Sequence, residues 1–144
     1  MLANLDPVLT GTILKALDEM GHGDSVVVAD AHFPAARLAA AAGAVVVDLP
    51  ERSTPRVLRA ICTVVPPDDL PAPGLDLMEC PDGLLDVQRE LIEAAGLTQD
   101  TTNLVERFAF YDIAARASLI VRTGETRIYG NALLRKGVVR DKEA

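Results

Sequence analysis

The stretch Val26–Ala29 (VVVA) decides the fold class of this chain. A continuous run of apolar, mostly β-branched residues predicts a strand that is buried on both faces, as in a sheet with helices on either side. A second such run, 44–49, follows an alanine-rich helix that Pro34 opens and that ends near Gly43. Strands that alternate with helices in this way predict a layered α/β domain.

Start and stop signals predict the remaining elements. Asp6 and Pro7 indicate the start of a first helix that ends at Gly21, and Thr54-Pro55 indicates another start. Further helices are expected over 84–95 and 107–117, and further strands over 75–80, 119–122 and 127–134. The tight turn Thr123-Gly124-Glu125 joins the last two strands, which predicts a C-terminal β-hairpin. We therefore expect one α/β/α domain over residues 1–144, with a mixed sheet and a frayed tail from about 138 to 144.

Composition excludes several classes of partner. The 144 residues carry 14 Lys and Arg against 21 Asp and Glu, a net charge of −7, with no basic run. Nucleic-acid binding requires clustered basic residues, so no nucleic-acid partner is expected. The longest uncharged apolar run is about ten residues, half of the roughly 20 that a membrane helix needs. With no signal peptide in view, we expect a cytoplasmic location in which Cys62 and Cys80 stay reduced.

Two histidines and one aspartate mark a candidate site near the first buried strand. Asp30 ends that strand, where ligands of open α/β sheets gather, although it could equally cap the following loop. His22 can transfer protons near neutral pH, although a histidine in a turn more often satisfies nearby carbonyls. His22, Asp30 and His32 together could ligate a metal in a hydrolase. Their spacing matches no recognised metal motif, so the sequence disfavours that interpretation.

The C-terminal half adds polar candidates. Tyr129 and Asn131 are two residues apart, so a regular strand would place both on one face. A phenol and a carboxamide suit sugar hydroxyls because both donate and accept hydrogen bonds. Gly130 between them lets a ligand approach the backbone. Arg107 is either a cation for an oxygen-rich ligand or half of a surface ion pair with Asp112 or Glu106.

Taken together, four segments closely resemble the L-fucose mutarotase family, which is related to the D-ribose pyranases. The likeness spans about residues 1–140. In order, the segments are 19–24 (EMGHGD), 30–34 (DAHFP), 107–111 (RFAFY) and the end of the chain with 123–125 (TGE), 129–131 (YGN), Leu134 and 136–137 (KG).

The resemblance implies a cofactor-free isomerase that interconverts the α and β anomers of a monosaccharide. It makes His22 the proton donor, and it makes Asp30, Arg107 and Tyr129-Gly130-Asn131 the sugar-binding positions. It also implies a homo-oligomer, a decamer of stacked pentamers, with sites close to subunit interfaces. The chain departs from the family pattern most between 39 and 76, and at Glu106, where a neutral residue is expected.

Acid–base chemistry suits these residues. Ring opening removes a proton from the anomeric hydroxyl and gives one to the ring oxygen, and reclosure on the other carbonyl face inverts the anomeric centre. Two alternatives stay open at this point. One is a sugar-binding or transport-accessory module without catalysis, and the other is a purely structural ring protein.

Overall fold

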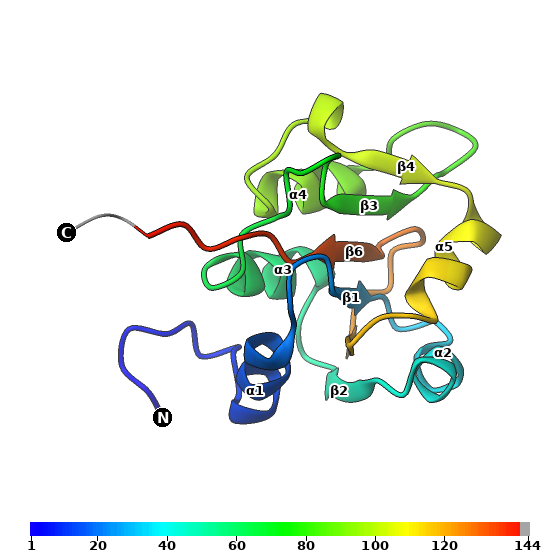
Figure 1. The fold of residues 1–144 in the computed structure, drawn as a ribbon. Helices are drawn as coiled ribbons and strands as arrows, with labels where there is room; N and C mark the ends of the chain where they lie inside the picture. Colours follow the sequence, from blue (N-terminus) through cyan, green and yellow to red (C-terminus); the bar gives the residue numbers. More distant parts are fainter. Residues whose placement is uncertain (142–144) are drawn as a thin grey trace.

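The computed structural model describes residues 1–141 and forms a six-stranded sheet with helices on both faces (Figure 1). The strands are β1 (Ser25–Ala29), β2 (Val45–Leu49), β3 (Leu75–Met78), β4 (Asn103–Val105), β5 (Leu119–Thr123) and β6 (Ala132–Arg135). The helices are α1 (Gly11–Glu19), α2 (Ala35–Ala42), α3 (Thr54–Cys62), α4 (Asp86–Ala94), α5 (Arg107–Ala114) and the 3₁₀ turn η1 (Gln99–Thr101).

The sheet is mixed, and its strand order is β2-β5-β1-β6-β3-β4. β1 pairs in parallel with β5 on one side and antiparallel with β6 on the other. β6 also runs antiparallel to β3, so it is the one reversed strand among those described. The predicted mixed sheet is therefore confirmed.

The predicted C-terminal hairpin is wrong. β5 and β6 follow one another along the chain, but β1 lies between them and bonds to both. β1 is apolar on both faces and takes a central place, so the segment 124–131 must pass beyond its end rather than turn back tightly. That segment forms a loop, and β6 begins at Ala132 instead of Arg127.

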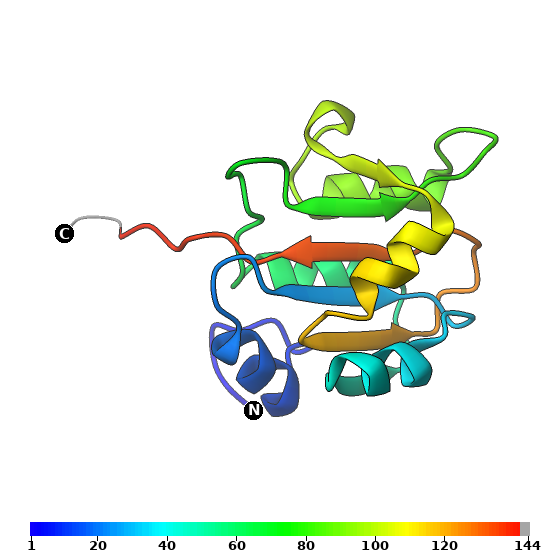
Figure 2. The ribbon, with the colours of Figure 1, turned by 45° about the vertical axis from the view of Figure 1, so that its right-hand side comes forward.

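Two apolar clusters, one on each face of the sheet, make the α/β/α layers. Helices α2 and α5 lie on one face, in front of the sheet in Figure 2, and α3 and α4 lie behind it. Val26 and Val28 of β1 belong to the cluster with α1, α3 and α4, whereas Val27 and Ala29 belong to the cluster with α2 and α5. This alternation explains why the VVVA run has no polar position.

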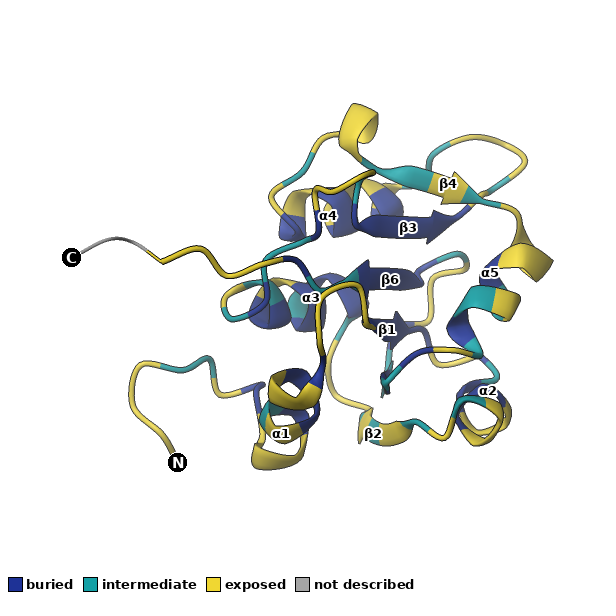
Figure 3. Ribbon diagram, viewed as in Figure 1, coloured by how far each residue is buried: buried dark blue, intermediate teal, exposed yellow. Residues whose placement is uncertain are grey.

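Three other expectations need correction. The strand 44–49 is expected to be buried, but β2 is an edge strand with Val45 and Val46 exposed (Figure 3). The first helix begins at Gly11 rather than near Pro7, because the Asp6 carboxylate accepts from Val8 N and pairs with Arg56 instead of capping it. No strand is expected at 103–105, where the structure has β4.

The ends of the chain and its thiols complete the description. Residues 138–141 are exposed and belong to no helix or strand, and the rest of the predicted frayed tail, 142–144, lies outside the described residues. Cys62 and Cys80 are both free thiols, as expected. Among the helices described, none is long and apolar enough to cross a membrane.

Candidate active site

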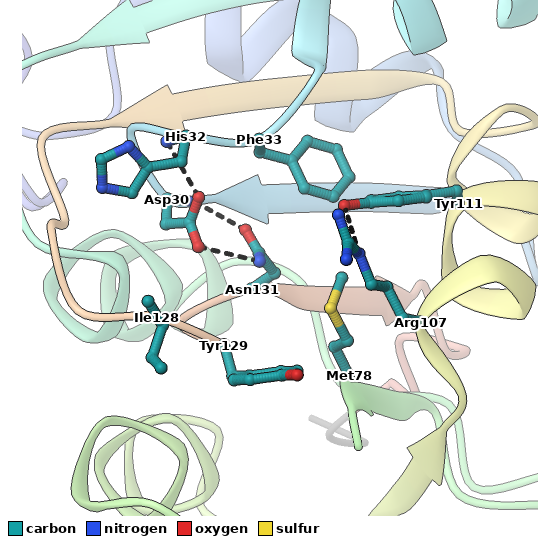
Figure 4. Close-up of a pocket in the computed structure, with 9 residues that line it drawn as sticks. All are labelled: Asp30, His32, Phe33, Met78, Arg107, Tyr111, Ile128, Tyr129 and Asn131. Carbon is teal, nitrogen blue, oxygen red and sulfur yellow. Dashed lines mark hydrogen bonds between the residues drawn. The ribbon is translucent and has the colours of Figure 1, made fainter. Parts of the chain in front are cut away.

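A pocket of about 280 Å³ lies where the carboxyl ends of β1 and β3 meet the amino end of the reversed strand β6 (Figure 4). Because β6 runs against its neighbours, residues before its first position stand beside residues that follow β1 and β3. The lining residues are Asp30, His32, Phe33, Met78, Arg107, Tyr111, Ile128, Tyr129 and Asn131. Four of the six predicted site residues thus converge: Asp30, Arg107, Tyr129 and Asn131.

Asp30 and Asn131 form the polar floor of the pocket. The Asp30 amide donates to Oδ1 of Asn131 at 2.7 Å, and Nδ2 of Asn131 donates to Oδ2 of Asp30 at 3.0 Å. The other carboxylate oxygen of Asp30 accepts from the His32 amide at 3.0 Å. Both side chains are buried, so their geometry is fixed before any ligand arrives.

Burial changes the pKa of Asp30, the titratable group of this floor. Loss of solvent around Asp30 raises the pKa of its carboxyl above 3.8, against the opposing effect of the bonds from His32 and Asn131. A carboxylate with a raised pKa at the bottom of a pocket accepts a hydrogen bond strongly from a ligand hydroxyl. It can also exchange a proton more readily than an exposed aspartate.

Arg107 stands at the first position of α5 and places a cation on the pocket wall. Its Nε donates to the Tyr111 hydroxyl at 3.2 Å, which raises the pKa of the guanidinium. The group also lies 5.5 and 5.6 Å from the ring centres of Phe108 and Tyr111. Among the residues described, no carboxylate pairs with it, so the surface ion pair with Asp112 or Glu106 is not formed.

Glu106, the departure from the family pattern, caps α5 instead. Its side chain accepts from the amides of Phe108 and Ala109 at 3.0 Å each, which holds the pKa of this carboxyl below its usual range. A carboxylate at a helix N-terminus is favoured by the exposed amides and by the helix dipole. Glu106 thus fixes the start of the helix that carries Arg107 and leaves the guanidinium free.

Tyr129 reaches the pocket from a loop, not from a strand. Its backbone has φ of 59°, the left-handed region, which turns its side chain toward the pocket as Figure 4 shows. Glu125 and Arg127 brace this loop through bonds of 2.9 and 3.0 Å, and Arg127 also pairs with Glu90 of α4. The regular strand assumed for these residues is wrong, although the convergence that it predicted is found.

Gly130 does not line the pocket. It is a buried residue of the loop 124–131. A Cβ built on it would come within 3.0–3.2 Å of atoms of Glu125, Arg127 and Val87. The glycine therefore allows protein to pack against its backbone at this point.

The sequence interpretation missed the apolar wall of the pocket. Phe33, Met78 and Tyr111 supply it, and the Phe33 ring packs edge-on against Tyr111 at 5.6 Å. The available signals were the position of Met78 at the end of a strand and the helical spacing of Tyr111 after Arg107. An apolar wall facing polar groups is typical of small-molecule sites.

His22, the predicted proton donor, lies elsewhere in the same chain. It precedes β1, whereas Asp30 follows β1, so the length of that strand separates them, about 16 Å at roughly 3.3 Å per residue. The three residues weighed as metal ligands, His22, Asp30 and His32, therefore do not converge within one chain.

His22 instead pairs with Asp68, which sequence reasoning missed. Nε2 of His22 lies 3.0 Å from Oδ1 of Asp68, and the imidazole is 49% exposed whereas Asp68 is 8% exposed. The bond from His22 lowers the pKa of the Asp68 carboxyl, so at neutral pH this group accepts. Nε2 then carries the hydrogen of this bond, and Nδ1 has no hydrogen-bond partner among the described residues.

Comparison with known proteins now identifies the family. The model of the RbsD / FucU transport protein family matches residues 3–139. The chain belongs to this family. It is 38% identical to the fucose mutarotase of Danio rerio over 153 residues, which covers 99% of this chain and 97% of that protein.

Solved structures of the RbsD / FucU family share the fold. The fucose mutarotase of Streptococcus pneumoniae, solved in complex with L-fucose, is 32% identical with a TM-score of 0.82, covering 96% of this chain and 100% of that one. FucU from Bifidobacterium longum is 34% identical with a TM-score of 0.82, covering 94% and 99%. Bacillus subtilis RbsD complexed with D-ribose is 18% identical with a TM-score of 0.76, covering 97% and 100%, and shows the fold alone.

Proposed function

We propose that this chain is a sugar mutarotase, an isomerase that interconverts the α and β anomers of a monosaccharide, L-fucose or a related sugar. The observation that carries the proposal is the convergence of Asp30, Asn131, Tyr129 and Arg107 on one small pocket. Its volume of about 280 Å³ is at the lower end for ligand sites and suits a single sugar ring. The relatives that match over the whole chain include fucose mutarotases.

The residues divide into binding and proton-transfer groups. Asp30 accepts from sugar hydroxyls, and Arg107 donates to sugar oxygens. Tyr129, which also lines the pocket, can donate or accept a proton there. His22, with Asp68 holding its Nε2, supplies the acid–base function, moving a proton between the anomeric hydroxyl and the ring oxygen. Such assistance accelerates a reaction by about 10²- to 10⁴-fold.

The distance between His22 and the pocket supports a site that two copies of the chain share. His22 and Asp68, which we call the dyad, lie at one end of β1 and cannot reach the pocket at its other end. We therefore propose that each copy presents its dyad to the pocket of its neighbour. We propose a head-to-tail contact, in which the surface with His22 and Asp68 on one copy meets the pocket of the next copy. Head-to-tail contacts close into rings, and the decamer of stacked pentamers implied by the family resemblance is an assembly of this kind.

The cytoplasm is the location that we propose for this assembly. Cys62 and Cys80 are unpaired, which suits a reducing compartment.

Saturation-transfer NMR tests the activity. With L-fucose, D-ribose and D-galactose as a panel, we expect protein-dependent exchange between anomer signals, fastest for L-fucose or a close relative. Binding without added exchange would support the alternative, a sugar-binding or transport-accessory module. A chain that neither binds nor exchanges any of these sugars would contradict both.

Mixing two inactive variants tests the shared site. His22→Gln keeps the pocket and loses the dyad, and Asp30→Asn keeps the dyad and weakens the pocket. Subunits mixed in equal amounts and allowed to exchange should regain about a quarter of wild-type activity, because that share of head-to-tail sites pairs an intact pocket with an intact dyad. No recovery after verified subunit exchange would show that each site lies within one chain.

A further inference from the structure

One short segment, Arg135–Gly137 at the end of β6, bonds to Asp68 and to the residues on either side of His22, the two members of the His22–Asp68 dyad. These two halves are 46 residues apart in the sequence and lie on separate loops. Neither loop belongs to a helix or strand that would fix it alone. A hydrogen bond of 3.0 Å between such loops needs a common support, because small displacements break it.

Lys136 holds the loop of His22 and the end of α1 through four hydrogen bonds. Its Nζ donates to the carbonyl oxygen of Leu17, in the last turn of α1, at 2.8 Å and to that of Met20, just after the helix, at 2.7 Å. Its own carbonyl accepts from Gly23 N at 2.9 Å, and its amide donates to Asp24 O at 2.8 Å. His22 therefore sits between residues that Lys136 fixes on both sides.

The neighbours of Lys136 hold the loop of Asp68. The Asp68 amide donates to the Arg135 carbonyl at 3.0 Å, and the Gly137 amide donates to the Pro66 carbonyl at 2.8 Å. Gly137 is so close that a Cβ on it would lie 2.8 Å from the Pro67 oxygen and 3.0 Å from Cα of Asp68. Consecutive residues of one strand end thus support both members of the dyad.

Charge pairing with a carboxylate does not explain the position of the Lys136 ammonium. Among the residues described, it has no carboxylate within ion-pair distance, and both of its bonds go to main-chain oxygens at the end of α1. A cation there is favoured by the helix dipole and satisfies carbonyls that lack helical partners. Because Met20 lies two residues before His22, the bond from Lys136 to the Met20 carbonyl also supports the loop that carries His22.

We propose that Lys136 is a positioning residue for the reaction: it sets the place of the His22 imidazole against Asp68 without touching the sugar. The inference rests on the proposed function, because it assumes that His22 transfers the proton. It predicts a change in turnover rather than in sugar affinity, since the hydrogen bonds that the ammonium donates go to the main-chain oxygens of Leu17 and Met20 and are not offered to a ligand.

Lys136→Met tests this directly, because it keeps the apolar stem and removes the donors. We expect kcat to fall by about 10- to 100-fold, as misplacement of a catalytic group by about 1 Å can cost roughly 100-fold, while KM changes by less than about twofold. Lys136→Arg, which can still donate to both carbonyls, should recover most of the loss. The matched control is Lys15→Met on the exposed face of α1, where Lys15 only pairs with Glu19.

A spectroscopic measurement separates this inference from the proposed function. The chain has two histidines, so nitrogen-15 NMR signals of the His22 ring can be assigned with His32→Gln. In wild type we expect one fixed tautomer with hydrogen on Nε2, and in folded Lys136→Met a mixture of tautomers. If the wild type exchanges no sugar anomers, the proposed function fails, yet the ring signals still test the support.

Two results would overturn the inference. One is a folded Lys136→Met variant with unchanged kcat and unchanged His22 ring signals. The other is a rise in KM at constant kcat, which would assign Lys136 to sugar binding. If Lys136→Met does not fold, Lys136→Gln, which keeps a donor for one carbonyl, undergoes the same two measurements with the same outcomes.

Discussion

Asp30 and Asn131 exchange two hydrogen bonds across 101 residues of sequence, and both side chains are buried at the bottom of the pocket. The pair joins the end of β1 to the start of β6, which run in opposite directions. One contact therefore fixes a binding group and ties two strands of the sheet together. Its loss should affect stability and sugar binding at once.

A double-mutant cycle measures this coupling. Asp30→Ala and Asn131→Ala should each lower the free energy of unfolding by about 1–3 kcal/mol, because each leaves a buried polar partner unsatisfied. The double variant should lose less than the sum, with a coupling of roughly 0.5–3 kcal/mol in urea unfolding. Asp100→Ala, at an exposed site, should change stability by less than about 0.5 kcal/mol. If the losses in the free energy of unfolding were additive, the two side chains would contribute to stability independently.

The pH dependence of stability tests the burial of Asp30. Its pKa in the folded chain is raised above the ordinary 3.8, so the folded state binds more protons than the unfolded state just above that pH. By linkage, the contribution of Asp30 to the free energy of unfolding falls as pH rises from about 4 through the folded pKa. Urea unfolding of wild type and Asp30→Asn between about pH 4 and 7 should show wild type losing stability relative to the variant. A relative gain with rising pH would contradict this.

Arg107→Met should weaken sugar binding and leave the fold intact. Among the described residues the guanidinium donates one bond, to Tyr111, so its other donors are available to a ligand in the pocket that Arg107 lines. We expect KM for the sugar to rise by about 10- to 150-fold, the effect of a hydrogen bond from a charged group worth roughly 1.5–3 kcal/mol, with a smaller change in kcat. Arg89→Met, on the exposed face of α4, is the matched control. Equal KM values for the two variants would remove Arg107 from the binding site.

Gly124→Ala should destabilise the loop that carries Tyr129. A Cβ at Gly124 would lie 1.9 Å from the carbonyl oxygen of Pro50, so the loop after β5 must move away from the loop after β2. A loss of about 1–3 kcal/mol is expected in thermal or urea unfolding. Gly11→Ala is the control, since nothing lies within 4 Å of its built Cβ, and it should stabilise the chain by up to about 1 kcal/mol. Similar effects at both glycines would contradict the close approach at Gly124.

Much of the fold could be predicted because it depends on local patterns. The VVVA run, the start at Pro34 and the stop at Gly43 gave β1 and α2 correctly, since side-chain periodicity and backbone restrictions act within a few residues. The hairpin was wrong because pairing is a choice between distant strands. The burial predicted for β2 is wrong because an apolar run does not reveal whether a strand lies at the edge.

The candidate site also has a part that the sequence predicts and a part that only the structure reveals. Asp30, Arg107, Tyr129 and Asn131 were found from residue type and from a family resemblance carried by short motifs. Asp68 was missed because it lies in a proline-rich connection without a motif, and its function depends on a contact 46 residues away. The sequence predicts that a ligand approaches the backbone of Gly130, but the atoms that approach it in the structure belong to the protein itself.

The sequence by itself determined the layered α/β class, the family, and the residue types of the pocket, because these follow from local periodicity and from short motifs. Only the tertiary structure decided which strands pair, that β1 separates β5 from β6, and that His22 and Asp30 stand at opposite ends of one strand. The physical reason is that strand order and the meeting of distant side chains come from the packing of all elements around both faces of the sheet. No local stretch of sequence contains that information.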